Sequence, residues 1–426
     1  MMHRHRRRQL PYWGIPLLYS AAAVVGGLAL PRIESRWLPG IESGISPVAA
    51  VVMYSTIGSG MIGLTGVVFA LAFVMVQFSA IAYSPRLVLW ISRDKVLWHS
   101  LGVFTATFLY SLSAIAWLDR NRSGRVPFFS GWLVVALLLT SICMFVALIE
   151  RISLLQIQRM LAFTGDHGRG VIEKLYPPLE TPSSTAEPAE FKRLPVTQTI
   201  LHTGRPRCIQ ALNEADLQAL ASDAGGIVEV VTSVGDTVVE GTMLARVYGG
   251  RKSIDEMALR SAFEMGTERT FEQDPKYALR LLVDIAIKAL SPAINDPTTA
   301  VQALDQIEDL LRRLGRRRLE IGAFNDSQGN LRLVVRHPSW DDFVLLAFDE
   351  IRVYGAKSVQ VMRRMKALAA DLISYVPPER QACLRHYQER LDATIARSFE
   401  DAEEKREASV EDRQGLGGPR RLQGGP

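Results

Sequence analysis

Residues 43–85 read SGISPVAAVVMYSTIGSGMIGLTGVVFALAFVMVQFSAIAYSP, and they form the longest stretch of the chain without a charged side chain. A helix needs about 20 apolar residues to cross the hydrocarbon core of a bilayer. This stretch is longer than one simple span requires, and small residues recur along it. We therefore expect a membrane protein with a helix suited to close contacts.

Small residues define one predicted face of this helix. They recur every three or four positions, which places them on the same side of a helix; the set is Ser55, Ser59, Gly63, Gly66 and Ala70. Gln77 falls on the same face further along. Small residues let helix backbones approach closely in lipid, and intramembrane polar residues usually face protein or water. The face is expected to pack within the chain, to pack between subunits or to line a pore; Gln77 also fits the headgroup boundary.

Four charge-free windows are long enough to cross a bilayer: residues 9–31, 43–85, 96–118 and 126–149. Six of the seven tryptophans lie near their ends, as interfacial tryptophans do; these are Trp13, Trp37, Trp90, Trp98, Trp117 and Trp132. The first window is longer than the core of a signal peptide, which is ~7–15 residues. We therefore predict four transmembrane helices in residues 1–150.

Basic residues between the windows predict the orientation. Nine lie on the N-terminal side of the membrane and five on the other, and the side with more Lys and Arg is usually cytoplasmic. Three arginines within residues 119–125 oppose this rule. We predict a multi-pass protein of the bacterial inner (plasma) membrane with both termini in the cytoplasm.

Composition excludes several classes of function. The net charge of the 426 residues is +5, but many arginines flank the apolar windows, so we interpret the charge as topological and predict no nucleic-acid partner. The three cysteines, Cys143, Cys208 and Cys383, form no CxxC or Cys/His cluster. Neither a metal site nor a disulfide framework is expected, which suits a reducing cytosol.

The predicted cytosolic part is an α+β region with a helical C-terminal part. Its segments are an amphipathic exit helix and linker (151–193), a small β-barrel-like domain (194–250), a mostly helical α+β domain (251–400) and a disordered tail (401–426). The barrel prediction rests on alternating β-branched residues and glycine turns, a spacing that resembles biotinyl and lipoyl carrier domains. Residues 248–252 do not match the hairpin that presents the carrier lysine, so no cofactor is expected.

A polar stripe follows one predicted helix of the cytosolic region. Asp274 can cap this helix with Pro275 at its first position, and Arg280, Asp284 and Lys288 then recur every four residues among apolar neighbours. Such a stripe forms either an internal ladder of ion pairs or a subunit interface or ligand site. The sequence leaves both interpretations open.

Three further polar groups are candidates for binding. Asn295 and Asp296 precede Pro297 at a predicted helix start, where exposed amides can bind an ion or simply fix a corner. Asp349 and Arg352 form an i,i+3 pair on another helix. Arginines also cluster within residues 312–318 and form either a solvated face or a contact with anionic lipid.

Three passages resemble the bacterial membrane-protein family known as domain of unknown function 2254. They are Gly63–Ala70 with Ser84-Pro85-Arg86-Leu87, the run from Leu281 through SPAINDPTTA (291–300), and AFDEIR (347–352). The resemblance covers roughly residues 10–400 and implies a topology but no established activity.

The motifs of common enzyme classes, GxxxxGK[ST], HExxH, GxSxG and a strand-borne GxGxxG, are absent from the sequence. Two functions that are not enzymatic fit the features above. The first is a homo-oligomeric channel or transport-related protein with a cytosolic regulatory collar. The alternative is a membrane-anchored ligand-binding or sensory module without a pore. An enzyme would need Asp284, Asp296, Asp349 or His337 to converge in one pocket; no catalytic residues are assigned.

Overall fold

The computed structural model describes residues 13–38, 44–82, 95–120, 126–153, 157–180 and 190–416. They belong to two compact units, Met1–Gln156 (unit 1) and Ile157–Pro426 (unit 2). The arginine-rich N-terminus, residues 83–94 with Trp90 and the SPRL motif, and most of the predicted linker lie outside the described residues.

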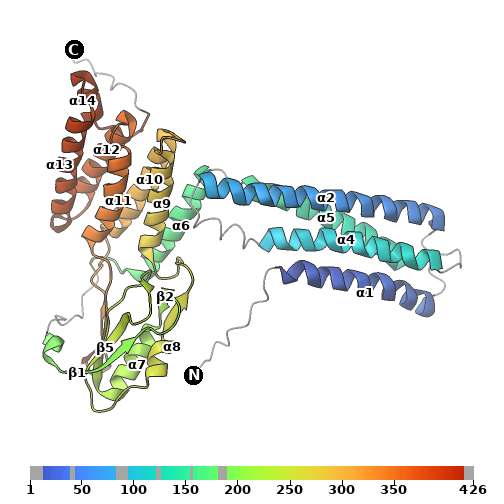
Figure 1. The fold of residues 1–426 in the computed structure, drawn as a ribbon, viewed down its shortest axis with the longest axis horizontal. Helices are drawn as coiled ribbons and strands as arrows, with labels where there is room; N and C mark the ends of the chain where they lie inside the picture. The colour runs from blue at the N-terminus through green and yellow to red at the C-terminus, as the bar shows by residue number, and fades with distance from the viewer. Residues whose placement is uncertain are drawn as a thin grey trace. The chain divides into compact units, whose positions relative to one another are not determined.

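Unit 1 contains four long helices: α1 (Gly14–Trp37), α2 (Pro47–Ala82), α4 (Lys95–Arg120) and α5 (Phe128–Ser153). Each includes a stretch that is long and apolar enough to cross a membrane. The prediction of four apolar helices is thereby confirmed. Helix α4 is central, since it packs against α1, α2 and α5, and the four helices run side by side (Figure 1).

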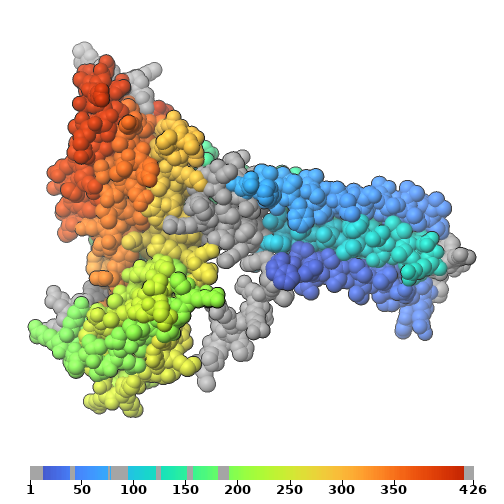
Figure 2. Space-filling view, viewed as in Figure 1, coloured from blue at the N-terminus to red at the C-terminus, as the bar shows by residue number. Residues whose placement is uncertain are grey.

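The interior of unit 1 is filled by large side chains. Tyr54, Phe104, Tyr110 and Leu148 are almost completely buried, and the helices pack without a visible gap along their length (Figure 2). Between α4 and α5, the hydroxyls of Thr107 and Ser141 form a hydrogen bond of 2.9 Å. Apolar packing combined with hydroxyl contacts is the usual way that helices associate in lipid.

Unit 2 contains two open β-sheets. The larger has the order β1-β5-β3-β8-β7, and the smaller has the order β4-β2-β6. The strands are β1 (Val196–Leu201), β2 (Arg207–Leu212), β3 (Gly226–Val230), β4 (Thr237–Val238), β5 (Met243–Gly249), β6 (Phe263–Gly266), β7 (Ala323–Asn325) and β8 (Leu331–Val335).

The described strands do not close into a barrel, so the predicted barrel-like domain at 194–250 needs correction. Strand β3 pairs with β5 on one side and, in parallel, with β8 on the other, with Val228 opposite Leu333. Strand β2 pairs with β6, which also lies outside 194–250. The alternating pattern predicted the strands, but two of their partners, β6 and β8, come from later parts of the chain.

Helices make up the rest of unit 2. They are α6 (Ile157–Leu175), α7 (Glu214–Ala224), α8 (Glu256–Ser261), α9 (Pro275–Ala289), α10 (Pro297–Leu314), α11 (Trp340–Tyr354), α12 (Val359–Tyr375), α13 (Gln381–Ser398) and α14 (Ala402–Ser409), with short 3-10 turns at Glu190–Arg193 and Pro378–Arg380. Helices α9 and α10 pack against each other, and α6 packs against both. The predicted exit-helix and linker segment (151–193) thus begins with the end of α5 and includes all of α6, which extends to Leu175.

The start of the predicted disordered tail is ordered. Asp401 caps α14 by accepting hydrogen bonds from the backbone N–H groups of Glu403 and Glu404, and Ala408 is fully buried. The helix packs against α12 and α13, as Figure 1 shows. The charged composition of residues 401–409 concealed this helix because charges cover only its exposed face.

Candidate functional site

The small-residue face of α2 points away from the other helices of unit 1. Ser55, Ser59, Gly63, Gly66, Ala70 and Gln77 are all exposed. The residues of α2 that contact the bundle are Ala50, Tyr54, Gly58, Met61 and Val68, all buried. At 3.6 residues per turn, the two sets lie on opposite sides of the helix. Within the described residues, the face of α2 that includes Gly63 and Gly66 is therefore not used for packing in the bundle.

This face is smooth and offers few unpaired polar groups. A Cβ atom added at Gly60, Gly63 or Gly66 would meet no described atom within 4 Å. The hydroxyl of Ser55 donates to the carbonyl of Val51, and that of Thr56 donates to the carbonyl of Val52 at 2.8 Å. Such back-bonding satisfies the hydroxyls within the helix. The face is therefore compatible with lipid or with the backbone of another helix.

The predicted polar stripe on α9 includes an internal ion-pair cluster. Arg280 donates to Asp284 at 2.7 Å and, through both terminal nitrogens, to the two carboxylate oxygens of Glu350 on α11 at 2.6 and 2.7 Å. Hydrogen bonding to Glu350 raises the pKa of Arg280, with burial opposing and Asp284 adding to the effect. Lys288 is half-buried on the same helix. The sequence did not indicate Glu350, which closes this cluster between α9 and α11.

The Asn295–Asp296 corner fixes the start of α10. The carboxylate of Asp296 accepts hydrogen bonds from the backbone N–H of Thr299 at 3.1 Å and from its hydroxyl at 2.5 Å. Asn295 has a left-handed backbone with φ of 49°, a conformation that Asn tolerates better than most residues. The predicted caps at Asp274 and Asp296, each followed by proline, are both present.

The other predicted pair lies between α11 and α13. Arg352 is buried, with 8% exposure, and donates to the hydroxyl of Thr394 at 2.8 Å. Asp349 lies 2.7 Å from Arg390 on α13 and 3.7 Å from Arg352. Asp284, Asp296 and Asp349 therefore have different neighbours. Asp284 pairs with a residue of α9, Asp296 caps α10, and Asp349 lies between α11 and α13.

The arginine cluster at 312–318 has intramolecular partners. Arg312 donates to Glu308 at 2.8 Å, and Arg317 donates to the carbonyl of Tyr176 at 2.9 Å. The Arg316 guanidinium lies 4.2 Å from the ring centroid of Tyr375. Within unit 2, this cluster therefore joins α10 to its neighbours; contact with anionic lipid stays a prediction.

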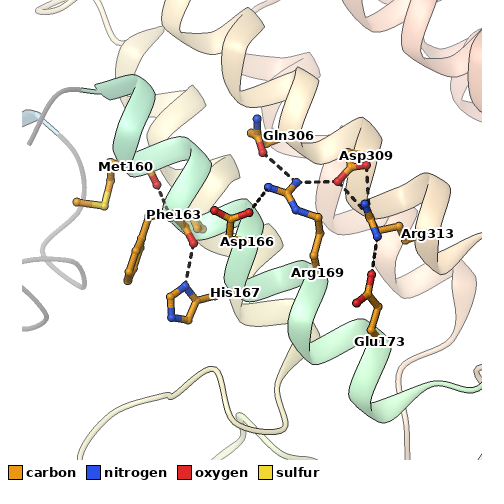
Figure 3. A network of polar contacts seen from close by, with 10 residues as sticks. Met160, Phe163, Asp166, His167, Arg169, Glu173, Gln306, Asp309 and Arg313 are labelled. Atoms are coloured by element: carbon orange, nitrogen blue, oxygen red, sulfur yellow. Dashed lines mark hydrogen bonds and ion pairs between the residues drawn. The ribbon is translucent and has the colours of Figure 1, made fainter. Parts of the chain in front are cut away.

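A polar network between α6 and α10 was not foreseen from the sequence (Figure 3). Arg169 donates to Asp166 and to Asp309, each at 2.7 Å, and Arg313 donates to Glu173 at 2.6 Å. Gly168 makes a close approach, since an added Cβ would lie 2.9 Å from the Cβ of Ala278. The glycine-rich segment 165–170 is thus part of a helix and lets α6 lie close against α9 and α10.

Four helices that are long and apolar enough to cross a membrane, followed by a unit of helices and sheets, are the features of an integral membrane protein. The chain belongs to the family described as predicted membrane protein (DUF2254), whose profile matches residues 9–371. The earlier resemblance is therefore confirmed.

The chain is similar to an uncharacterized protein of Mycobacterium bovis and to uncharacterized proteins of two Mycobacterium tuberculosis strains. Each is 26% identical over 415 residues, which is 93% of this chain and 77% of the relative. No solved structure matches the chain. Among the described residues, no group of three His, Cys, Asp or Glu side chains is arranged to hold a metal ion.

Proposed function

We propose that this chain is a homo-oligomeric protein of the bacterial inner membrane, in which α2 of one copy packs against α2 of another. One observation supports the proposal: the small-residue face of α2 is exposed, while the opposite face packs in the bundle. Lipid chains are as apolar as Leu side chains, so helices in a bilayer associate through close packing rather than through water exclusion. Ser59, Gly63 and Gly66 would allow such an approach.

The oligomer would carry a channel or transport path between copies rather than through one bundle. Tyr54, Phe104 and Tyr110 fill the interior of unit 1, which favours a path outside it. Ser55, Ser59 and Gln77 would supply polar groups along that path. Both termini of the chain would lie in the cytoplasm, and unit 2 would then act as a regulatory collar.

The test compares two glycines of α2. Gly63→Leu blocks the small-residue face, whereas Gly60→Leu places the same side chain at an exposed position about 100° around the helix from the centre of that face. Because both variants replace Gly by Leu, helix propensity rises equally in both, and a difference between them reflects the position on the helix. We expect Gly63→Leu to reduce the oligomer mass measured by light scattering in detergent and Gly60→Leu to leave it unchanged. A wild-type protein that is strictly monomeric would contradict the proposal.

Ion flux into proteoliposomes separates the channel from the alternative function. Flux that Gly63→Leu abolishes and Gly60→Leu retains supports a path along α2. An intact oligomer without flux under any ion gradient would favour a membrane-anchored ligand-binding or sensory module, in which unit 2 binds the ligand.

A further inference from the structure

A small cavity lies in unit 2 where five segments of the chain meet. These are the end of α6, the start of α7, the turn between β3 and β4, the start of α9 and the link from β8 to α11. Its volume is about 20 Å³, and about 10–15 Å³ suffices for one water-sized group. The lining residues are Leu175, Tyr176, Leu212, Glu214, Ser233, Val234, Gln273, Asp274, Pro275, Val335, Arg336, His337 and Pro338.

Three buried polar atoms among these residues have no hydrogen-bond partner in the described part of the chain. They are Oη of Tyr176, Oδ2 of Asp274 and Nε2 of His337. Tyr176 is completely buried and Asp274 is 3% exposed. Leaving a buried polar group unsatisfied is destabilising, so three such atoms on residues around one cavity indicate an occupant that bonds to them.

Local structure holds Asp274 in place while leaving one oxygen available. Its Oδ1 accepts from the backbone N–H of Tyr277 at 3.1 Å and caps α9. Its Oδ2 lies 3.2 Å from Nε of Arg269 as an ion pair, but Arg269 directs its Nε–H to the carbonyl of Gly235 at 2.9 Å. Gly235 has φ of 92°, and an added Cβ would clash with both charged groups. The loop therefore requires glycine here.

Two carboxylates line the cavity, those of Asp274 and Glu214. The amide of Gln273 is occupied on both sides by the backbone of Leu212. Burial lowers the pKa of His337 to about 4, so this ring is neutral at pH 7. Burial raises the pKa of Asp274 to about 6, against the opposing effect of Arg269, so this carboxylate is still ionised at pH 7. Arg269 balances one carboxylate, and Arg336 at the rim is exposed.

We propose that this cavity binds an ammonium ion or the ammonium group of a small primary amine. A single nitrogen with three or four N–H donors fits the volume and can donate to Asp274, to the Tyr176 oxygen and to Nε2 of His337 in the tautomer that carries its proton on Nδ1. The apolar walls formed by Val234 and Pro338 would exclude competing water. This inference goes beyond the proposed oligomer and does not depend on it.

Ligand binding here would connect several segments of unit 2. Tyr176 directly follows α6, the helix that comes after the membrane helices in the sequence, and Asp274 begins α9. His337 lies between β8 and α11. An ammonium group bonded to all three would stabilise the position of α6 within unit 2.

The experiment measures thermal unfolding of the full-length protein in detergent at pH 7.5 and constant ionic strength. Ammonium chloride is compared with potassium chloride, whose cation has a similar size but no donors, and with tetramethylammonium chloride. We expect a saturable rise in Tm with ammonium that exceeds the rise with either control salt. Equal effects of ammonium and potassium would overturn the proposal. A further rise with methylammonium assigns the site to amines, whereas a response to ammonium alone assigns it to free ammonia.

Two substitutions locate the effect. Tyr176→Phe and Asp274→Asn should each weaken ammonium binding, by about tenfold for a lost hydrogen bond to a charged group. Tyr248→Phe is the matched control, because the hydroxyl of Tyr248 donates to Glu229 at 2.9 Å away from the cavity. Unchanged ammonium affinity in Tyr176→Phe would place the binding elsewhere and overturn the proposal. If Asp274→Asn does not fold, Glu214→Gln tests the same charge contribution, with weaker binding expected.

Discussion

Glu34, near the end of α1, accepts hydrogen bonds from the backbone N–H and from the hydroxyl of Ser130 at the start of α5, both at 3.0 Å. The other carboxylate oxygen accepts from the backbone N–H of Phe129 at 2.7 Å. Glu34 is buried, with 4% exposure. A residue from another helix therefore caps the N-terminus of α5 and satisfies amides that would have no partner within the helix.

Replacing Glu34 by alanine should destabilise unit 1. The change leaves buried amides of α5 unpaired, at a cost of about 1–3 kcal/mol. We expect a lower Tm for Glu34→Ala in detergent micelles, measured by circular dichroism. Ser35→Ala is the control, since the exposed hydroxyl of Ser35 bonds only to the carbonyl of Arg32 within α1. Equal Tm values for the two variants would show that the cap contributes no stability.

Two glycines of α6 should respond oppositely to alanine. At Gly168 the new methyl group would lie 2.9 Å from Ala278 and from Leu310, whereas at Gly170 it would meet nothing within 4 Å. Overpacking typically costs about 1–3 kcal/mol, while Gly→Ala in an open helix position gains up to about 1 kcal/mol. We therefore expect chemical denaturation to show that Gly168→Ala is less stable and Gly170→Ala more stable than the wild type. A stabilising Gly168→Ala would show that α6 can move away from α9 and α10 without cost.

Asp274 should make stability depend on pH. Its pKa is raised from 3.8 to about 6 by burial, although Arg269 and Lys276 act to lower it. The folded state therefore favours the protonated form, and this stabilisation is complete below pH 3.8 and is lost as the pH rises through about 6. Because Asn is neutral throughout, Asp274→Asn should gain stability relative to the wild type between pH 4 and pH 7.5.

The gain follows from a shift of about two pKa units, which corresponds to roughly 3 kcal/mol at most. Melting curves of both proteins across this pH range, without ammonium salts, provide the measurement. If the difference in Tm between wild type and Asp274→Asn does not change with pH, ionisation of the buried Asp274 carboxylate does not destabilise the folded state.

The pairing of Arg280 with Glu350 should be measurable as a coupling energy. A double-mutant cycle with Arg280→Met and Glu350→Gln isolates the interaction between α9 and α11 from the contact with Asp284. Glu350 is 45% exposed, so solvent screening limits the coupling to about 1 kcal/mol. Strictly additive effects in urea denaturation would show that the two side chains contribute independently.

Local features of the structure could be predicted well from the sequence. The Asp-Pro pairs at 274–275 and 296–297 correctly predicted where α9 and α10 begin, because capping involves residues only a few positions apart. The four apolar helices could be predicted from hydropathy, because the hydropathy of a segment also depends only on neighbouring residues.

Long-range partners could not be predicted. One of the two interpretations of the stripe paired Arg280 along its own helix, and the structure adds Glu350, which is 70 positions away. The cavity around Tyr176 and Asp274 combines five separate segments, and the Asp-Pro motif of one of them indicates a helix start but not the other four segments. Periodicity placed Ser59 and Gly63 on one face of α2, but it does not indicate which face contacts the bundle, because both faces are apolar.

The parallel pairing of β3 with β8 also constrains how the chain folds during synthesis. Val230 lies opposite Val335, so the ribosome must add about 100 residues before β3 obtains its second neighbour. Until then β5 covers one edge of β3, and the other edge presents unpaired backbone groups that attract foreign strands. The α9 and α10 helices are made within this interval, and their apolar faces can bury each other while the sheet is still incomplete.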